Sequence, residues 1–509
     1  MTQKPHQRTK EWGDFQTPRS FSEQVCALLF EKGIRPRSIL EPTCGMGNFL
    51  LSALEYFPSA TTSVGIDINA DYIEHLKGTL ATQGRGQQRH VTVAQGDFFD
   101  FDWPGLLDSL AEPILVIGNP PWVTNAELTK LRSDNLPEKS NLWDFSGLDA
   151  ITGKSNFDIS EWMLIQLLAH IQNRDAVLAM LCKTSVARKV LQYAWEKDFR
   201  LESSSIYLFD AHEIFGVSTD AGLLICKTSR KQSCKVYGDL SEEVHAATFG
   251  LRDDQLISRP RLYDRWKHLQ GSEHYRWRSG IKHDAARVME LEKEAEGYRN
   301  KLGELYVLES DYLYPMLKSS DVANGKVADI TRWMLVTQKF VGEATTAIRD
   351  NAPRTWQYLQ EHQAFFDSRK SAVYKDRPPF SIFGVGDYAF AMWKVAISGL
   401  YKTLHFAVIG PYAGKPVVLD DTCYFISCDS QEEAEYLATL LNSEIAQEFF
   451  SAYIFWDKKR PITAGILRRL DLMALAKELG SENPLESLGR APGSSDNWRQ
   501  QIPLGLQSA

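Results

Sequence analysis

The residues best suited to chemistry form the short run Asn119-Pro120-Pro121-Trp122, directly after the apolar segment 114–118. Because proline has no backbone N–H, two prolines after a buried strand end it and leave the Pro120 carbonyl without a sheet partner. The Asn119 side chain adds a second acceptor, and two acceptors suit an NH2 group, which has two hydrogens to donate. Trp122 adds a flat surface on which a planar heterocycle can stack. The structural alternative is a rigid loop with a buried tryptophan.

A second candidate is the glycine-containing segment 41–47 (EPTCGMG), which follows one predicted strand and opens a helix. A strand that stops at glycines lets a ligand approach the backbone amides at a helix N-terminus. Asp67 ends the next predicted strand about 20 residues farther on, where an acidic side chain can accept hydrogen bonds from ribose hydroxyls. The alternative for Asp67 is a helix-capping aspartate.

A third candidate is Asp97-Phe98, which follows the next predicted strand. Asp97 can accept a hydrogen bond from an exocyclic amine, and Phe98 can cover one face of a purine ring. A surface turn uses the same residue types. The position at the carboxyl end of a strand, beside the other two motifs, is what favours a nucleoside site.

The elements that must position these motifs alternate along residues 1–235, as in a parallel sheet covered by helices. The expected strands are 38–41, 62–67, 91–95, 114–118, 176–181, 204–208 and 221–227, and the expected helices include 21–32, 48–56, 71–81 and 160–170. Seven strands with crossover helices predict one doubly wound α/β domain. Each motif then follows the carboxyl end of a strand.

The second half of the chain has a different composition. The polar segment 229–255 is expected to be a connection, and the region 250–476, rich in Trp, Tyr, Phe and Arg, is expected to form a mixed α+β domain. It should contain a long charged helix around 283–302. Residues 480–509, rich in Gly, Ser and Pro, are expected to be a disordered tail.

Composition narrows the class of protein. The 509 residues are 43% hydrophobic and 24% charged with a net charge of -8, which is typical of a soluble globular protein. No apolar run approaches the ~20 residues that span a bilayer, and the start lacks the apolar core of a signal peptide. We therefore expect a cytoplasmic protein without membrane contact. Seven scattered cysteines indicate reduced thiols, and no residue cluster predicts a metal site.

The motifs and their order resemble the S-adenosylmethionine-dependent amino-methyltransferases of DNA, specifically the adenine-N6 group with gamma motif order. The N-terminal cofactor motif of that group is matched by Phe15-Gln16-Thr17-Pro18, and the resemblance covers about residues 11–230. It implies a Rossmann-like seven-stranded methyltransferase domain followed by a DNA-recognition domain. The glycine motif departs from the commonest form at Cys44 and Met46. We interpret Cys44 as filling space, because a free cysteine packs like a small hydrophobe unless an electropositive neighbour activates it.

The resemblance also implies a role for each site residue. Phe15, Thr17 and Pro18 would line the methionine end of the cofactor, and Glu41, Thr43, Gly45 and Gly47 its amino-acid portion; Asp67 would hold its ribose, and Asp97 with Phe98 its adenine. Asn119 and Pro120 would bind the target amine. Trp122 and Phe215 would stack against a base flipped out of the helix. The structural alternative for Phe215 is a core residue.

Clusters that interleave basic and aromatic residues indicate double-stranded DNA as the partner of the second region. They are 275–278 with Lys282, 332–333 with Lys339, 354–356, 368–370 with Lys375 and Arg377, and 456–461. Four stretches, 277–284, 383–388, 419–425 and 455–461, resemble target-recognition domains of restriction–modification methylases. The resemblance implies modification in a bacterial, nucleoid-associated setting, with a separate restriction endonuclease as partner, or none.

Several alternatives stay open. The same amine chemistry serves DNA cytosine-N4 methylation, although members of that type more often begin the tetrapeptide with Ser. A third alternative is a methyltransferase that acts on RNA or on a protein amide. A fourth alternative is a non-catalytic DNA-binding subunit that keeps the fold. His283 and His405 are interpreted as structural or phosphate-contacting, and His212 as part of a surface loop.

Overall fold

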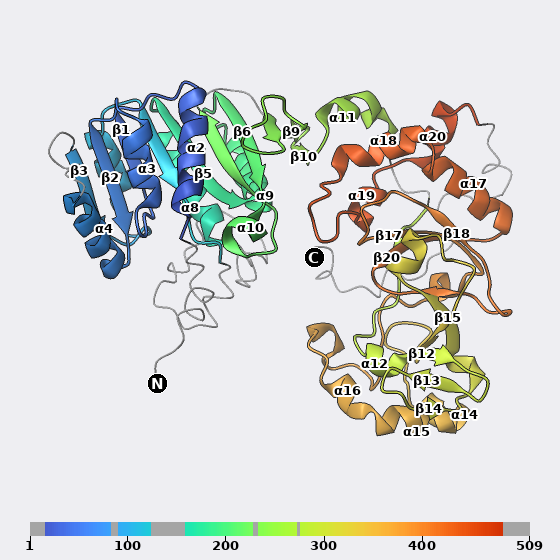
Figure 1. The fold of residues 1–509 in the computed structure, drawn as a ribbon. Coiled ribbons are helices and arrows are strands. Elements are labelled where there is room, and N and C mark those ends of the chain that lie inside the picture. Colours follow the sequence, from blue (N-terminus) through green and yellow to red (C-terminus); the bar gives the residue numbers. More distant parts are fainter. Residues whose placement is uncertain (1–15, 83–89, 124–157, 228–232, 272–274, 482–509) are drawn as a thin grey trace, which may run out of the picture. The chain divides into compact units, whose positions relative to one another are not determined.

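The computed structural model describes residues 16–82, 90–123, 158–227, 233–271 and 275–481 (Figure 1). The chain divides into two compact units, with the boundary between Pro260 and Arg261. Each unit has its own sheets and its own buried core, so each is described by itself.

Unit 1 is built on one ten-stranded sheet with the order β10-β9-β8-β6-β7-β5-β4-β1-β2-β3. Its strands are β1 (Ser38–Glu41), β2 (Thr62–Asp67), β3 (His90–Gln95), β4 (Ile114–Gly118), β5 (Ala176–Lys183), β6 (Ser203–Phe209), β7 (Ala221–Lys227), β8 (Ser233–Tyr237), β9 (Ala247–Arg252) and β10 (Gln255–Ile257). Its helices are α2 (Arg19–Glu31), α3 (Asn48–Tyr56), α4 (Ala70–Thr82), α5 (Trp103–Ser109), α8 (Ile159–Ile171), α9 (Thr184–Glu196) and α10 (Ala211–Phe215).

The seven predicted strands form the continuous block from β6 to β3. All pair in parallel except β7, which runs antiparallel to both β5 and β6. The chain starts at β1 and proceeds to β2 and β3 on one side, then returns to β4 and β5 on the other. Helices α2, α3 and α4 bury their apolar faces in one core cluster together with alternate residues of β1, β4 and β5, such as Ile39, Leu115 and Ala179. The α/β class and the methyltransferase-like core predicted from the sequence are confirmed.

The prediction that residues 229–255 form a polar connection is wrong, because β8, β9 and β10 extend the same sheet. The error has a physical cause: these short strands together bury fewer than half of their residues. Cys234 and Tyr237 of β8 point inward among polar neighbours, and Tyr237 stacks on Tyr207 with ring centroids 4.3 Å apart. A strand in which only one side chain in two or three is buried contains about as many polar residues as a loop, so its composition does not indicate a strand.

Unit 2 contains a four-stranded sheet (β11-β20-β17-β18) and a six-stranded sheet (β14-β13-β12-β16-β15-β19). The strands are β11 (Arg278–Ser279), β12 (Glu290–Lys293), β13 (Tyr298–Asn300), β14 (Leu305–Tyr306), β15 (Leu313–Leu317), β16 (Arg332–Leu335), β17 (Trp393–Ser398), β18 (Ala407–Ile409), β19 (Val418–Leu419) and β20 (Cys423–Cys428). The helices are α11 (Pro260–Trp266), α12 (Ala286–Met289), α13 (Ser319–Ala323), α14 (Ala347–Asn351), α15 (Pro353–Glu361), α16 (Gln363–Asp367), α17 (Gln431–Leu441), α18 (Glu444–Tyr453), α19 (Ala464–Leu467) and α20 (Leu472–Glu478). The predicted mixed α+β character is present.

The long charged helix predicted around 283–302 is wrong. Only α12 is helical there, and the chain then forms the antiparallel hairpin β12–β13. The charges that suggested a solvated helix face instead pair within the hairpin, where Arg299 Nε lies 2.6 Å from Glu294 Oε1. Glu290 is buried and is held by the ammonium groups of Lys301 and Lys318.

No helix in the described ranges is long and apolar enough to cross a bilayer. Within the same ranges, no group of three or more His, Cys, Asp or Glu side chains is arranged to hold a metal ion. All seven cysteines are buried and none forms a disulfide.

Lys394 of β17 gives a test of the unit 2 core. Its side chain is 1% exposed, its ammonium donates to the Ala391 carbonyl, and burial lowers its pKa from 10.5 to about 7. Between these values the unfolded chain binds the proton and the folded protein does not, so this group makes the folded protein more stable as pH rises from 7 toward 10.5. Lys394→Met should therefore be more stable than the wild type at pH 7, with a difference that shrinks at pH 10. Urea unfolding at both pH values measures the difference in free energy of unfolding between the variant and the wild type. The same difference at pH 7 and pH 10 would contradict a lowered pKa of Lys394.

Candidate active site

The glycine motif and the tetrapeptide meet at the point where the strand order reverses. Strands β1 and β4 are neighbours in parallel register, with Leu40 opposite Val116, so their carboxyl ends lie side by side. The Thr43 hydroxyl donates a 3.4 Å hydrogen bond to the backbone carbonyl of Asn119. Open α/β sheets bind ligands in the crevice at such a switch point. The two motifs found first in the sequence are therefore in direct contact.

The glycine turn between β1 and α3 is closed by backbone hydrogen bonds and leaves no room for side chains. Gly47 N–H donates to the Cys44 carbonyl (2.7 Å), and Gly45 and Gly47 have φ values of +47° and +81°. A Cβ on Gly47 would lie 2.3 Å from Leu76 Cδ1, and one on Gly45 would lie 2.6 Å from Gln16 Oε1. Both positions therefore require glycine for conformation and for space.

The segment before α2 packs against this turn. Gln16 Oε1 accepts the Met46 N–H (2.9 Å), and Asn48 Nδ2 donates to the carbonyl of Thr17 (2.8 Å). Thr17 is buried, and Phe15 lies outside the described residues. Sequence reasoning quoted Gln16 within its motif but gave it no role. Its only signal was its position in the run 15–18.

Asp67, at the end of β2, faces the turn rather than the following helix. Its Oδ2 accepts the Gly45 N–H (2.7 Å) and its Oδ1 accepts the Asn69 N–H (2.8 Å). The cap of α4 comes instead from Asn69, whose Oδ1 accepts the Asp71 N–H (2.9 Å). The helix-capping alternative for Asp67 is therefore not what the structure contains, and its carboxylate is oriented toward the glycine turn.

Glu41 lies beneath the turn and is fully buried. Its Oε2 accepts the Leu50 N–H (2.8 Å), one of the first-turn donors of α3 that have no partner inside the helix. Burial, reinforced by the negative charge of Asp67, raises the pKa of the Glu41 carboxyl well above its usual value. Cys44 is also buried, and burial together with the charges of Glu41 and Asp67 raises the pKa of its thiol. A thiol kept protonated in this way fills space, as interpreted from the sequence.

Asp97 and Phe98 follow β3 at the same edge of the sheet. Asp97 Oδ1 accepts the Phe99 N–H (2.9 Å), which fixes the turn after the strand. The Phe98 ring is 5% exposed and packs on Trp103 with centroids 4.9 Å apart. In this conformation the ring is covered by protein, so its contact with a purine stays a prediction.

Trp122 and Phe215 are brought together from distant parts of the chain. Their rings meet edge to face, with centroids 5.4 Å apart and planes at 71°, and Phe209 lies 6.4 Å from Trp122. Trp122 is 6% exposed, and Phe215 is half-buried at the end of α10. A planar base does not fit between rings at this separation. Stacking by Trp122 therefore requires this aromatic contact to open.

Of the histidines considered from the sequence, one lies in unit 1 and two lie in unit 2. His212 is exposed in α10, which begins with an Asp210 cap, so the loop predicted there is a short helix. His283 is buried in unit 2, with its Nε2 3.6 Å from Glu290 Oε1, and His405 is exposed in the same unit.

No established protein-family profile matches the chain. A curated relative, the type II methyltransferase M.NspV of Nostoc sp., is 45% identical over 476 residues, which cover 92% of this chain and 98% of the relative. The chain belongs to the type II methyltransferases. Among solved structures, the type IIL restriction–modification enzyme MmeI in complex with DNA matches with a TM-score of 0.54 at 13% identity, over 94% of this chain and 68% of that one. That match concerns the fold.

Type II methyltransferases are modification enzymes of restriction–modification systems, and their cofactor is S-adenosylmethionine. The turn of this methyltransferase is suited to such a ligand, because it opens α3, whose N-terminus favours anionic groups, and because the Asp67 carboxylate is oriented toward it. The residues that would hold the cofactor are those of the glycine turn with Asp67.

In unit 2 of this type II methyltransferase, the stretches singled out in the sequence converge. Lys282 and Phe383 exchange both backbone hydrogen bonds (2.8 and 2.9 Å), and the Ile281 N–H donates to the Leu419 carbonyl (2.7 Å). The fourth stretch reaches the third through Arg460, whose guanidinium lies 3.5 Å from Asp421. Gly280 and Gly384 allow the crossing, because a Cβ on either would lie about 2 Å from a backbone carbonyl.

The basic clusters of unit 2 divide into two kinds. Arg332 and Arg354 are held by Asp321 and Glu309, and Arg369 lies flat on the Tyr374 ring at 3.7 Å, so these cations serve the fold. The neighbouring loop carries three exposed cations, Lys370, Lys375 and Arg377, and none of these three forms an ion pair with another described residue.

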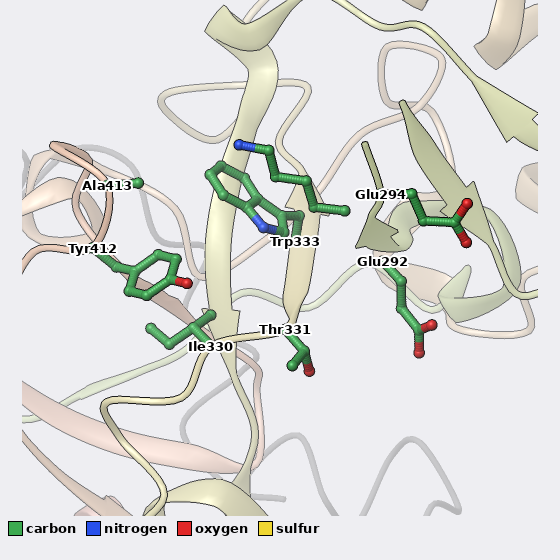
Figure 2. Close-up of a pocket in the computed structure, with 8 residues that line it drawn as sticks. Glu292, Glu294, Ile330, Thr331, Trp333, Tyr412 and Ala413 are labelled. Atoms are coloured by element: carbon green, nitrogen blue, oxygen red, sulfur yellow. The ribbon is translucent and has the colours of Figure 1, made fainter. Parts of the chain in front are cut away.

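A shallow groove lies elsewhere on unit 2, against β12 and β16 (Figure 2). Figure 2 shows the carboxylates of Glu292 and Glu294 at one side and the Trp333 ring at its centre. Lys293 also lines the groove, and Glu294 is paired with Arg299, so the groove carries charges of both signs.

Replacing Gly47 by Ala tests the turn. Alanine at a positive φ costs about 1 kcal/mol, and here the added methyl also meets Leu76. Gly33→Ala is a matched control, because Gly33 has a similar φ (+78°) with nothing near its Cβ position. We expect Gly47→Ala to destabilise more than the control in urea unfolding and to weaken S-adenosylmethionine binding in calorimetric titration. Equal effects of the two variants would contradict the packing of the turn.

Proposed function

We propose that this type II methyltransferase transfers a methyl group from S-adenosylmethionine to the N6 amino group of an adenine flipped out of double-stranded DNA, at a specific sequence. The observation that carries the proposal is the junction of β1 and β4. There the Thr43 hydroxyl of the glycine turn donates to the backbone carbonyl of Asn119, the residue whose side chain begins the acceptor pair. An amine bound by these acceptors lies next to the residues that would hold the cofactor.

In the proposed reaction the protein has to orient the target amine and make its lone pair available. The cofactor supplies an activated methyl group on a sulfonium. Adenine N6 is a poor nucleophile because its lone pair is delocalised into the ring. Hydrogen bonds from the NH2 group to the Asn119 side chain and the Pro120 carbonyl pull the nitrogen toward tetrahedral geometry and localise that pair. As N6 takes the methyl group, the methyl–sulfur bond would break to leave a neutral thioether, and the methylated nitrogen would release one N–H proton to solvent. Transfer then depends on positioning more than on a strong base.

The proposal requires the target base to leave the helix, because N6 lies within the stacked duplex. Trp122 of the tetrapeptide and Phe215, which contacts it, are the aromatic residues that would replace the lost stacking once their mutual contact opens. The base would separate the two rings and take the place of one of them. Phe215 would then contact the base edge-on from α10.

Adenine is favoured over cytosine-N4 by the Asn that begins the tetrapeptide, and DNA over RNA or a protein amide by unit 2. The converging stretches 277–284, 383–388, 419–425 and 455–461 would read the sequence, and the cations of the loop 370–377 would contact phosphates. The modification would mark host DNA in a restriction–modification system, with the cognate endonuclease as a separate protein.

The direct test compares wild type with Asn119→Ala. Both are incubated with labelled S-adenosylmethionine and genomic DNA, and the methylated base and its sequence context are identified. We expect N6-methyladenine from the wild type. The variant should lose methyl transfer but keep cofactor affinity, because the hydrogen bond from Thr43 is made to the backbone carbonyl of residue 119, which alanine retains.

Other products of this assay are decisive. Label in cytosine would replace adenine with the N4 reaction, and label in RNA or protein alone would overturn the role of unit 2. No label from folded, cofactor-binding wild type would favour the non-catalytic subunit. A parallel loss of cofactor binding in Asn119→Ala would make Asn119 structural.

Neutralising the exposed loop cations tests the DNA interface. The triple variant Lys370→Gln, Lys375→Gln, Arg377→Gln should raise the KM for DNA and flatten its salt dependence, by up to about 0.9 in the log–log slope for each phosphate that the loop no longer neutralises. Its kcat at saturating DNA should stay near that of the wild type. Arg299→Gln is the control, because the guanidinium of Arg299 is already paired with the carboxylate of Glu294. Equal salt slopes in the wild type and the triple variant would exclude this loop from the interface.

A further inference from the structure

Lys183 is the last residue of β5, and it lies beside the tetrapeptide. Strands β4 and β5 pair in parallel with Gly118 opposite Met180, so the chain that continues past Gly118 runs along the last residues of β5. The Lys183 ammonium donates to the Trp122 backbone carbonyl (3.2 Å) and to Asp158 Oδ2 (2.6 Å). One cation therefore connects the end of the tetrapeptide to the start of α8.

Asp158 is a rigid anchor for this cation. It caps α8, and its Oδ1 accepts both the backbone N–H (3.1 Å) and the hydroxyl (2.5 Å) of Ser160. Its side chain is 8% exposed, and that of Lys183 is 23% exposed, so water screens the pair only in part. A charge-assisted hydrogen bond in such surroundings is stronger than a neutral one and sets geometry more tightly.

A second hydrogen bond links α8 to Val123, the residue that follows the tetrapeptide. The Ile159 N–H donates to the Val123 carbonyl (2.9 Å), so the start of α8 contacts the chain directly after Trp122. At the other end, Thr43 contacts the Asn119 carbonyl. The backbone of residues 119–123 is thus tied at both ends, by the glycine turn at one and by Lys183 with α8 at the other.

We propose that Lys183, anchored by Asp158, is a positioning residue that sets the orientation of the tetrapeptide for methyl transfer. The inference rests on the proposed function, because it assigns the Asn119 amide and the Pro120 carbonyl to the target amine. Lys183 acts through the backbone of Trp122. Without its hydrogen bond, the acceptor pair and the indole can shift relative to the methyl group, and misplacement of reacting groups by about 1 Å can cost two orders of magnitude in rate.

The test uses a matched pair of lysines. Lys189 of α9 lies 2.8 Å from Glu161 of α8, so it also forms an ion pair with that helix, but neither residue has a described contact with the tetrapeptide. Lys183→Met should lower kcat by about 10- to 100-fold while the Kd for S-adenosylmethionine is unchanged. Lys189→Met should leave both values unchanged. Lys183→Arg, which keeps a donor and the positive charge, should restore most of the missing kcat.

Asp158→Asn serves as the second variant should Lys183→Met not fold. The amide keeps an oxygen for Ser160, and so keeps the cap of α8, but removes the negative charge that holds Lys183. We expect a lower kcat with an unchanged unfolding temperature and an unchanged cofactor Kd. Wild-type kcat in Lys183→Met or Asp158→Asn would overturn the inference. Equal decreases of kcat, cofactor affinity and unfolding temperature, shared with Lys189→Met, would also overturn it.

These outcomes separate the inference from the proposed function. The function fails if the wild type methylates no adenine in DNA or if Asn119→Ala stays active. If the wild type methylates adenine, Asn119→Ala is inactive and Lys183→Met is fully active, the function stands and only the positioning role of Lys183 is wrong.

Discussion

The parallel pairing of β1 with β4 is the constraint on which the rest of the site depends. It joins the elements on either side of the reversal in strand order, and it brings two segments more than 70 residues apart to one crevice. The ladder places the two segments that follow these strands side by side, and the hydrogen bond from Thr43 to Asn119 then joins them. The glycine turn and the tetrapeptide take their positions from this ladder, and Asp67 takes its position from the neighbouring pairing of β1 with β2.

Much of unit 1 was predictable because its signals are local. The strands β1, β2, β4 and β7 and the helix α3 begin and end where hydrophobic pattern and glycine or proline placed them. The adjacency of the motifs followed from a topological rule about parallel sheets. The contacts of Lys183 and Gln16 were not predictable, because a lysine at the end of a strand and a glutamine before a helix have no pattern that distinguishes them from surface residues.

Unit 2 was harder, for reasons that its own residues explain. Its strands are only two to six residues long, and a run of that length is too short for hydrophobic periodicity to indicate a strand. The run 283–302 has the charge density of a solvated helix, yet Glu290 is buried among cations from other elements. Ion pairs with residues distant in the sequence allow a charged residue to be buried. A charged residue in the sequence therefore does not by itself indicate an exposed position. The converging stretches were visible as segments, but their crossing at Gly280 and Gly384 appears only in three dimensions.

The edge-to-face contact of Trp122 with Phe215 has an energetic consequence for discrimination between bases. The resting protein covers the indole beside Asn119 with its own rings. Under the proposed reaction, an entering ring must replace an aromatic contact that contributes about 0.5–1.5 kcal/mol by stacking that contributes about 1–3 kcal/mol. Two fused rings cover an indole more completely than a single ring does. In that reaction, the free energy needed to separate the two rings would be offset more fully by stacking of a purine than by stacking of a pyrimidine.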